Sequence, residues 1–457
     1  MSALPQLDPA SAVRQLERLI AAQNHAEALA LCDALLAAAP DNPVYWNARG
    51  LSLRSLDRPR EALPCFWRSI ALDPQAPASW TNLGNALKDL KQLSRSILAH
   101  RRAVALRPRD AMLSHNLGLA LVQDRQFDAG IAAFDHTLAL DPGRRAVRWD
   151  RALARLYQGD YARGWEDYEA RLTTGQMPKR PVPGAAWNGS AFPGKTLLVL
   201  SEQGFGDAIW VARFLPRLRA LGGRIILEAR PELIPLFAGQ GYADAVVPKG
   251  APLPAAALHL HQCSLPRLFA ATPRAVQGQP YLRADPARIA RFSALFADAG
   301  SLFKLGIVWS GSATFKGNAD RAQPLARFLD AFALPGVRLY SLQKGPQARE
   351  LEAAGGSVID LAPHLRDFAD TAAMLHHLDL VIMTDTAVAH LCGALGRPVW
   401  VLLNHVPHFI WSEACDAAPW YDSVRLFRPN AWEDWNGVYD RAGAALLHAV
   451  LGRAASA

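Results

Sequence analysis

The chain has 457 residues, a length that favours about three domains of ordinary size. Hydrophobic residues make up 51% of it and charged residues 20%, which is enough for packed cores and argues against long disordered segments. The net charge of +8 is spread over both halves, so no concentrated basic patch indicates nucleic-acid binding. No apolar run approaches about 18 residues, so we expect no transmembrane segment.

The cysteines favour a reduced compartment. They are five in number and include no C-x-x-C pair: Cys32, Cys65, Cys263, Cys392 and Cys415. The first residues, MSALPQLDPA, show no basic region followed by an apolar core, so we expect no signal peptide. Both features predict a cytoplasmic chain without disulfides.

The first third of the chain is a repeat. Prolines recur every 34 residues at Pro40, Pro74, Pro108 and Pro142, and glycines do so at Gly50, Gly84 and Gly118. This period is typical of tetratricopeptide repeats, in which each unit is a helix pair. We expect Gly84 to lie where two helices approach closely and Pro108 to end the second helix. Residues 1–177 are therefore predicted to form an α-solenoid of about five helix pairs, atypical at both ends.

A stack of this kind forms a curved groove whose usual ligand is a peptide or protein. We therefore expect a protein partner to bind the repeats. The alternative is that the array serves only as a spacer or as a dimerisation surface.

The rest of the chain has an α/β pattern. After a Pro/Gly-rich linker at residues 178–194, short apolar runs alternate with helical patterns, and they are TLLVLS, RIILEA, AVVP, LHLHQ, KLGIVWS, VRLYSLQ, LDLVIMT and PVWVLL. We predict two Rossmann-like domains, at residues 195–290 and 291–457, with a final helix at about residues 434–451 that packs back across the pair. Two such domains that face one another leave a cleft, the default ligand site.

The segment QGFGDAI follows the first of these strands and begins a helix. Gly204 and Gly206 permit a sharp turn in an acceptor-side loop that includes Gln203, and Asp207 is expected at or near the helix N-cap. Asp207 either caps the helix or has a chemical role. A carboxylate repels a diphosphate, so a chemical role would place this loop beside an acceptor hydroxyl, from which Asp207 removes the proton as a general base.

The segment TDTAVAHL follows a buried strand of the second domain. Asp385 and Thr386 are expected to cap the next helix, whose first N–H groups suit a diphosphate. His390 lies on the same helical face as Thr386, and Asp385 is able to accept hydrogen bonds from sugar hydroxyls. The alternative is an ordinary N-cap with a buried histidine.

Further candidates for donor binding follow two other strands of the second domain. They are Ser310, Gly311, Lys316, Arg321, Gln343 and Lys344. Ser310 and Gly311 would present hydrogen-bond donors, and Lys316 and Arg321 would neutralise a nucleoside-diphosphate leaving group. Gln343 and Lys344 would line the nucleotide pocket. The alternative is that the loop charges are only solvated. No D-x-D motif is evident, and the pairs His259/His261 and His405/His408 lack a carboxylate partner, so we predict metal-independent chemistry.

Taken together and in order, these segments resemble a known family. SEQGFGDAIWVARFLP, VWSGS, LYSLQKG, DFADTAAML, TDTAVAHLCGALGRPVWVLL and PWYDSVRLFRP are similar to segments of bacterial tetratricopeptide-repeat glycosyltransferases. The catalytic half of that family resembles lipopolysaccharide heptosyltransferases, with a GT-B fold of two facing Rossmann-like domains. The resemblance covers nearly the whole chain, and some members of the group look like flagellin glycosyltransferases.

The resemblance implies roles for particular residues. Gly206 and Asp207 match the glycine loop of the heptosyltransferases, which implies that Asp207 is the base, and Asp385, Thr386 and His390 match their donor-binding motif. One departure is evident, because NADRAQPL lacks the second Arg followed by Ser that many relatives carry after the position of Arg321. This departure leaves the identity of the donor open.

We therefore expect an inverting glycosyltransferase that uses a nucleotide sugar and no cofactor. The acceptor would be a Ser or Thr hydroxyl of a protein held by the repeats, and the resemblance implies flagellin. Two alternatives remain, namely a non-catalytic adaptor with a degenerate GT-B half and a heptosyltransferase-like enzyme that modifies lipopolysaccharide core sugars.

Overall fold

A computed structural model describes residues 8–175, 180–411, 417–432 and 434–454. The chain forms two compact units. Of the described residues, 8–158 and 167–175 belong to the repeat unit, and 159–166 together with those from 180 onward belong to the α/β unit. Cys415 and the boundary at residues 177 and 178 lie outside the described residues.

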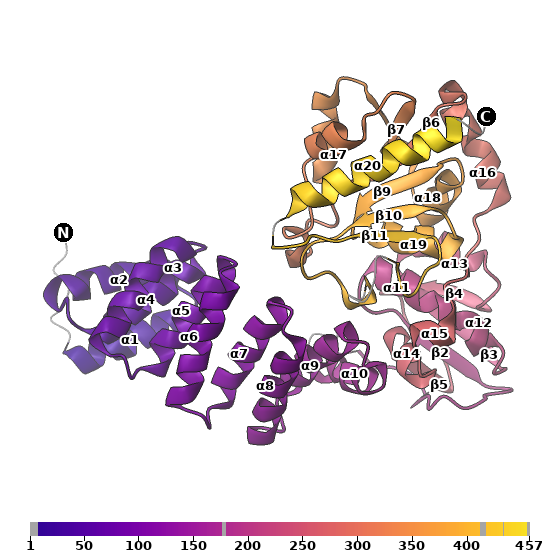
Figure 1. Cartoon of the computed structure of the whole chain (residues 1–457). Helices are drawn as coiled ribbons and strands as arrows, with labels where there is room; N and C mark the ends of the chain where they lie inside the picture. Colours follow the sequence, from indigo (N-terminus) through magenta and orange to yellow (C-terminus); the bar gives the residue numbers. More distant parts are fainter. Residues whose placement is uncertain (1–7, 176–179, 412–416, 433, 455–457) are drawn as a thin grey trace. The chain divides into compact units, whose positions relative to one another are not determined.

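The repeat unit consists of paired helices, as the period predicts (Figure 1). The pairs are α1 (Pro9–Ala21) with α2 (His25–Ala38), α3 (Pro43–Ser55) with α4 (Pro59–Leu72), α5 (Pro77–Asp89) with α6 (Leu93–Leu106), and α7 (Ala111–Gln123) with α8 (Phe127–Leu140). They are followed by α9 (Arg145–Tyr157) and by the shorter α10 (Tyr161–Tyr168), most of which belongs to the α/β unit. Each recurrent proline lies two residues beyond the end of a second helix, which cannot continue through it.

The recurrent glycines allow the two helices of a pair to touch. A β-carbon added to Gly50, Gly84 or Gly118 would lie only 2.6, 2.6 or 2.5 Å from the ring of Phe66, His100 or Phe134 respectively. A second 34-residue series escaped the sequence analysis. The turns after α1, α3, α5, α7 and α9 each hold one residue with positive φ: Gln23, Asp57, Lys91, Arg125 and Gly159.

The N-terminal sheet of the α/β unit is parallel, with strand order β1-β5-β2-β3-β4. Its strands are β1 (Ala185–Ala186), β2 (Thr196–Leu200), β3 (Arg224–Ala229), β4 (Ala245–Pro248) and β5 (Leu258–His261). The helices that accompany it are α11 (Phe205–Val211), α12 (Leu215–Arg219), α13 (Ile234–Ala238), α14 (Leu265–Leu268) and α15 (Pro273–Val276). The four predicted strands of this sheet are present, and β1 was not predicted.

The C-terminal sheet is also parallel, with strand order β11-β10-β9-β6-β7-β8. Its strands are β6 (Phe303–Val308), β7 (Val337–Ser341), β8 (Val358–Asp360), β9 (Leu380–Thr384), β10 (Val399–Leu402) and β11 (Val424–Phe427). Its helices are α16 (Pro286–Phe292), α17 (Leu325–Phe332), α18 (Phe368–Leu375), α19 (Ala387–Leu395) and α20 (Trp435–Ala454). The strands β8 and β11 were not predicted.

Helix α20 completes the core of the C-terminal sheet. Its buried face, which includes Val438, Tyr439 and Leu446, packs with Phe328 and Phe332 of α17 in one apolar cluster. Figure 1 shows α20 running over this sheet. Among the described residues, no helix has both the length and the apolar character that a membrane crossing requires.

The strand orders define where ligands are expected. In each sheet the chain first adds strands on one side of its first long strand and then crosses to the other side, so the order reverses between β2 and β5 and between β6 and β9. Open parallel sheets bind ligands outside the carboxyl ends of the strands at such a reversal. The predicted loops that contain Asp207 and Asp385 both begin at these points.

Candidate functional site

Asp207 closes the first turn of α11 and keeps one oxygen free. The N-cap is Gly204, so Asp207 lies three residues further on and not at the cap itself. The Gly204 N–H donates to Asp207 Oδ2 at 3.0 Å. The other oxygen, Oδ1, has one ionic neighbour among the described residues, His408 Nε2 at 3.9 Å. Capping therefore occupies one oxygen of the carboxylate and leaves the other available for chemistry.

The turn before α11 is held in an unusual conformation. Gln203 has φ = 57°, a left-handed conformation that is uncommon outside glycine. The Arg230 guanidinium donates to the Gln203 carbonyl, and it also lies 5.1 Å from the centre of the Phe205 ring. These contacts fix the loop from which Asp207 projects.

The N-terminus of α19 has polar groups with few partners. Asp385 is 5% exposed, and its only ionic neighbour in the described part of the chain is Arg321, with 3.8 Å between Nη1 and Oδ2. Thr386 is the N-cap, but its hydroxyl oxygen is buried and makes no hydrogen bond within the described residues. Buried acceptors without donors are costly, so this position favours a ligand that supplies hydrogen bonds.

His390 is buried and neutral. Its Nδ1 lies 3.0 Å from the Tyr421 hydroxyl, and its ring stacks on Trp411 with 4.8 Å between centroids. Burial lowers the pKa of His390 well below its usual value, and the neighbouring charges of Arg213 and Arg321 act in the same direction. Any contact with a ligand would thus be a hydrogen bond or ring packing and not a charge interaction.

Helices α11 and α19 are in direct contact at their N-terminal turns (Figure 1). A β-carbon on Gly206 would lie 2.8 Å from the His390 ring and 3.6 Å from the Ala387 Cα. Only glycine fits between the helices here, because any other side chain would push them apart. The structure therefore brings together the two predicted motifs, one from each sheet.

Arg321 extends to the same place from the loop after β6. A β-carbon on Gly311 would lie 2.8 Å from Arg321 Nη2, so the guanidinium lies over that glycine, and it reaches Asp385 as described. Asn318 organises the loop, since its Oδ1 accepts from the Gly311 N–H and its Nδ2 donates to the Ser310 hydroxyl. The sequence analysis missed Asn318, although it lies within the quoted loop.

Two other predicted donor-binding residues have different surroundings. Gln343 Oε1 accepts from the N–H groups of Trp309 and Ser310, at 3.1 and 2.9 Å, and Gln343 Nε2 donates to the Lys344 carbonyl. Its amide thus supports the end of β6. Lys344 Nζ donates to the Leu365 carbonyl, in the segment after β8. The side chain of Lys316 lies outside what the structure describes.

Two buried charged residues near the site were not predicted. Glu202 is the second residue after β2, and its Oε1 accepts from the Cys263 N–H at 2.8 Å, which connects the segments that follow β2 and β5. Arg213 lies among aromatic rings, 4.9 Å from the centre of Tyr281 and 4.5 Å from that of Tyr421. The position of Glu202 at a strand end was a usable signal, whereas Arg213 had none.

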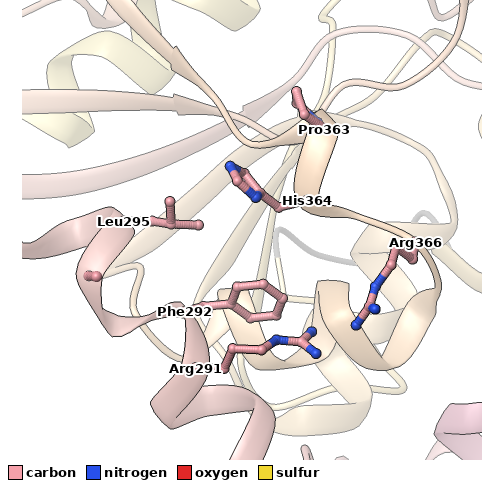
Figure 2. Close-up of a pocket in the computed structure, with 7 residues that line it drawn as sticks. Arg291, Phe292, Leu295, Pro363, His364 and Arg366 are labelled. Atoms are coloured by element: carbon pink, nitrogen blue, oxygen red, sulfur yellow. The ribbon is translucent and has the colours of Figure 1, made fainter.

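A surface pocket of about 410 Å³ lies elsewhere on the α/β unit, and none of the predicted residues lines it. Figure 2 shows the Arg291 and Arg366 guanidinium groups near the Phe292 ring. Both arginines donate to the buried Asp370. Burial acts to raise the pKa of Asp370, but the Arg366 hydrogen bond and the Arg288 charge outweigh it and lower that pKa. We therefore assign these arginines to an ion network around the buried Asp370.

Comparison with known proteins gives limited similarity. No family model matches the chain. The sequence is 29% identical over 334 residues to Protein FlbA of Caulobacter vibrioides, an alignment that covers 66% of this chain and 54% of that protein. The chain thus spans about half the length of this curated relative.

Solved structures match about a third of the chain. They include MamA, at 21% identity and a TM-score of 0.32 over 35% of this chain and 92% of that one. Another is YrrB, described as a TPR protein with an unusual peptide-binding site, at 18% identity and a TM-score of 0.32 over 36% of this chain and 86% of that one. This chain itself shows both the 34-residue sequence period and the paired helices that characterise tetratricopeptide repeats. The repeat unit is a tetratricopeptide-repeat solenoid.

Proposed function

We propose that the chain is a glycosyltransferase with a GT-B architecture that moves a sugar from a nucleotide-sugar donor to a Ser or Thr hydroxyl of a protein. The contact between α11 and α19 carries the proposal. It brings a carboxylate with one oxygen outside the helix cap close to a helix N-terminus at which the Thr386 hydroxyl has no hydrogen-bond partner among the described residues. The first is suited to an acceptor hydroxyl, and the second to the donor.

The donor side is composed of three features. The N–H groups at the start of α19 and the Arg321 guanidinium would neutralise the diphosphate, whose negative charge increases as the sugar leaves. Asp385 would accept hydrogen bonds from hydroxyls of the sugar or ribose, which would remove the cost of its burial. Gln343 and Asn318 would hold the β6 loop in place around them.

The transfer would follow from this division. Asp207 Oδ1 takes the proton of the acceptor hydroxyl while the hydroxyl oxygen forms a bond to the anomeric carbon. The bond from that carbon to the phosphate oxygen breaks, and its electron pair leaves with the nucleoside diphosphate. Attack and departure from opposite faces of the sugar ring invert the anomeric centre.

The acceptor is a protein held by the repeat unit. The groove of such a solenoid is suited to an extended segment of polypeptide. Flagellin is the acceptor that the family resemblance implies. Transfer to lipopolysaccharide core sugars and a purely adaptor role are the outcomes against which this proposal is tested.

The test uses the full chain and two variants. Calorimetry with a panel of nucleotide sugars identifies the donor, and transfer of labelled sugar to flagellin is then followed. Asp207→Asn is expected to retain donor binding and to lose transfer by at least about 10²-fold. Asp385→Asn is expected to weaken donor binding by about tenfold, the effect of one hydrogen bond to a charged group.

Asp330→Asn, on the exposed side of α17, is the matched control and should leave both properties unchanged. If the wild-type chain binds no nucleotide sugar, the proposal fails in favour of an adaptor. If sugar is transferred to a glycan while no protein is labelled, the lipopolysaccharide alternative replaces it. Wild-type transfer by Asp207→Asn removes Asp207 as the base.

A further inference from the structure

His408 faces the free oxygen of Asp207 from the other sheet. It lies in the segment after β10, immediately before a short helical turn at Phe409–Trp411. Its Nε2 is 3.9 Å from Asp207 Oδ1, and the two side chains are 36% and 27% exposed. The pair thus joins one residue from each half of the α/β unit at a place that a substrate is able to reach.

The separation of the two atoms suits an inserted oxygen. A distance of 3.9 Å is too long for a hydrogen bond between Nε2 and Oδ1. One hydroxyl oxygen can, however, lie about 2.8 Å from each of them, at ordinary hydrogen-bond length. Such a hydroxyl would donate its proton to Asp207 and accept a hydrogen bond from His408.

The surroundings of His408 favour the tautomer that this requires. Its Nδ1 is buried and has no hydrogen-bond partner within the described residues. A proton on Nδ1 would therefore lack an acceptor, whereas a proton on Nε2 faces Asp207. The ring packs on Phe409 with 4.2 Å between centroids, and Phe409 is buried against Trp165, so the imidazole is held in this direction.

We propose that His408 is a positioning residue that orients the acceptor hydroxyl toward Asp207. This inference rests on the glycosyltransferase proposed above. His408 donates a hydrogen bond from Nε2–H to the hydroxyl oxygen and retains its own proton throughout. The hydroxyl proton passes to Asp207, and the lone pair that then points at the anomeric carbon makes the new bond. His408 selects the orientation of the oxygen, while Asp207 accepts the proton.

The test compares two substitutions in the full chain. His408→Leu removes the donor and is expected to lower kcat for transfer by about 10²-fold, with the KM for the nucleotide sugar unchanged. His408→Gln keeps an N–H donor near the same place and should remain within about tenfold of the wild-type kcat. His405→Leu, in the same segment but beside Trp432, is the control. A wild-type rate for His408→Leu, or equal losses in the Leu and Gln variants, overturns the inference.

A second measurement does not depend on transfer. Nitrogen-15 NMR of histidine-labelled protein reports which ring nitrogen of His408 carries the proton. We expect Nε2, and a proton on Nδ1 alone would overturn the inference, since the nitrogen that faces Asp207 would then be unable to donate. If the wild-type chain transfers no sugar with any donor, the proposed function fails, and the tautomer still decides the orientation of His408.

Discussion

Single residues in this chain deviate from their repeats in ways that have measurable consequences. His100 packs against Gly84 at the position where the neighbouring repeats have a phenylalanine, Phe66 or Phe134, against the equivalent glycine. It is completely buried, and both ring nitrogens lack a hydrogen-bond partner among the described residues. Burial lowers the pKa of His100 from 6.5 to about 3, with smaller contributions from Lys88 and Arg54.

This burial makes the repeat unit sensitive to acid. Because the pKa of His100 is lower in the folded chain, this histidine is protonated below pH 6.5 in the unfolded chain but stays neutral in the folded chain until the pH approaches about 3. The free energy of unfolding therefore falls as the pH drops from 6.5 toward 3, at a rate approaching about 1.4 kcal/mol per pH unit. His100→Phe should be more stable than wild type, and by a larger margin at pH 5 than at pH 7.5.

Urea unfolding followed by far-ultraviolet circular dichroism at both pH values checks this. His136→Gln is the control, because His136 is exposed and its ring nitrogen contacts only the Pro108 carbonyl among the described residues. An equal margin at the two pH values would contradict the assignment of the acid sensitivity to His100.

Gly206 makes the second prediction at the scale of residues. Gly206→Ala places a methyl group 2.8 Å from the His390 ring and should cost about 1–3 kcal/mol of stability in the α/β unit. Denaturant unfolding measures the loss. Gly452→Ala on α20 is the control, since no atom of the described residues lies within 4 Å of the added carbon, and it should be neutral or slightly stabilising. No loss in Gly206→Ala would mean that α11 and α19 do not meet as described.

At the scale of elements, α10 combines two environments. Its first residues, up to Glu166, belong to the α/β unit. Trp165 is 2% exposed, donates from Nε1 to the Ala271 carbonyl at 2.8 Å, and packs against Trp210. Trp165→Ala should therefore destabilise the α/β unit by about 3–5 kcal/mol, as expected for truncation of a buried tryptophan.

The loss is measured by thermal and denaturant unfolding. Trp67→Ala on α4 is the matched control, because Trp67 is among the exposed large side chains of the repeat unit, and its removal should cost far less. If both substitutions cost the same, the α/β unit does not depend on α10.

These elements also show what sequence patterns reveal. The 34-residue period specified the paired helices, because each pair repeats the same local packing of a glycine on a ring. The eight apolar runs correspond to eight of the eleven strands in the described part of the chain, because buried parallel strands are continuously apolar. The short β1 and β8 carry too few residues to stand out, and β11 is interrupted by the exposed Arg425.

The candidate site was predictable where residues follow strand ends and not where they meet through tertiary contact. Asp207 and Asp385 lie in the segments that follow the carboxyl ends of β2 and β9, and an apolar run followed by a loop and a helix marks such a position in the sequence. The pairing of Asp207 with His408 joins residues far apart in the chain, and no periodic signal marks it. Gln343 was likewise predicted to bind the donor because its side chain is polar, but its Oε1 accepts hydrogen bonds from the backbone at the end of β6.

At the scale of the whole α/β unit, a buried cation connects the two sheets. Arg213 lies two residues beyond α11. Its guanidinium donates to the carbonyl of Trp210 and to that of Trp420, which lies four residues before β11. The described residues provide no carboxylate within ion-pair distance of it, so backbone oxygens and the rings of Tyr281 and Tyr421 stabilise the charge.

Arg213→Leu should therefore loosen both halves together. The two carbonyls would lose their donor inside the protein, at a cost of about 2–4 kcal/mol in total. Hydrogen exchange followed by mass spectrometry should show faster exchange in peptides from α11 and from β11 alike. Arg217→Leu, four residues later and exposed over the Phe269 ring, should leave both unchanged. Faster exchange confined to α11 would mean that Arg213 stabilises its own helix and not the connection between the sheets.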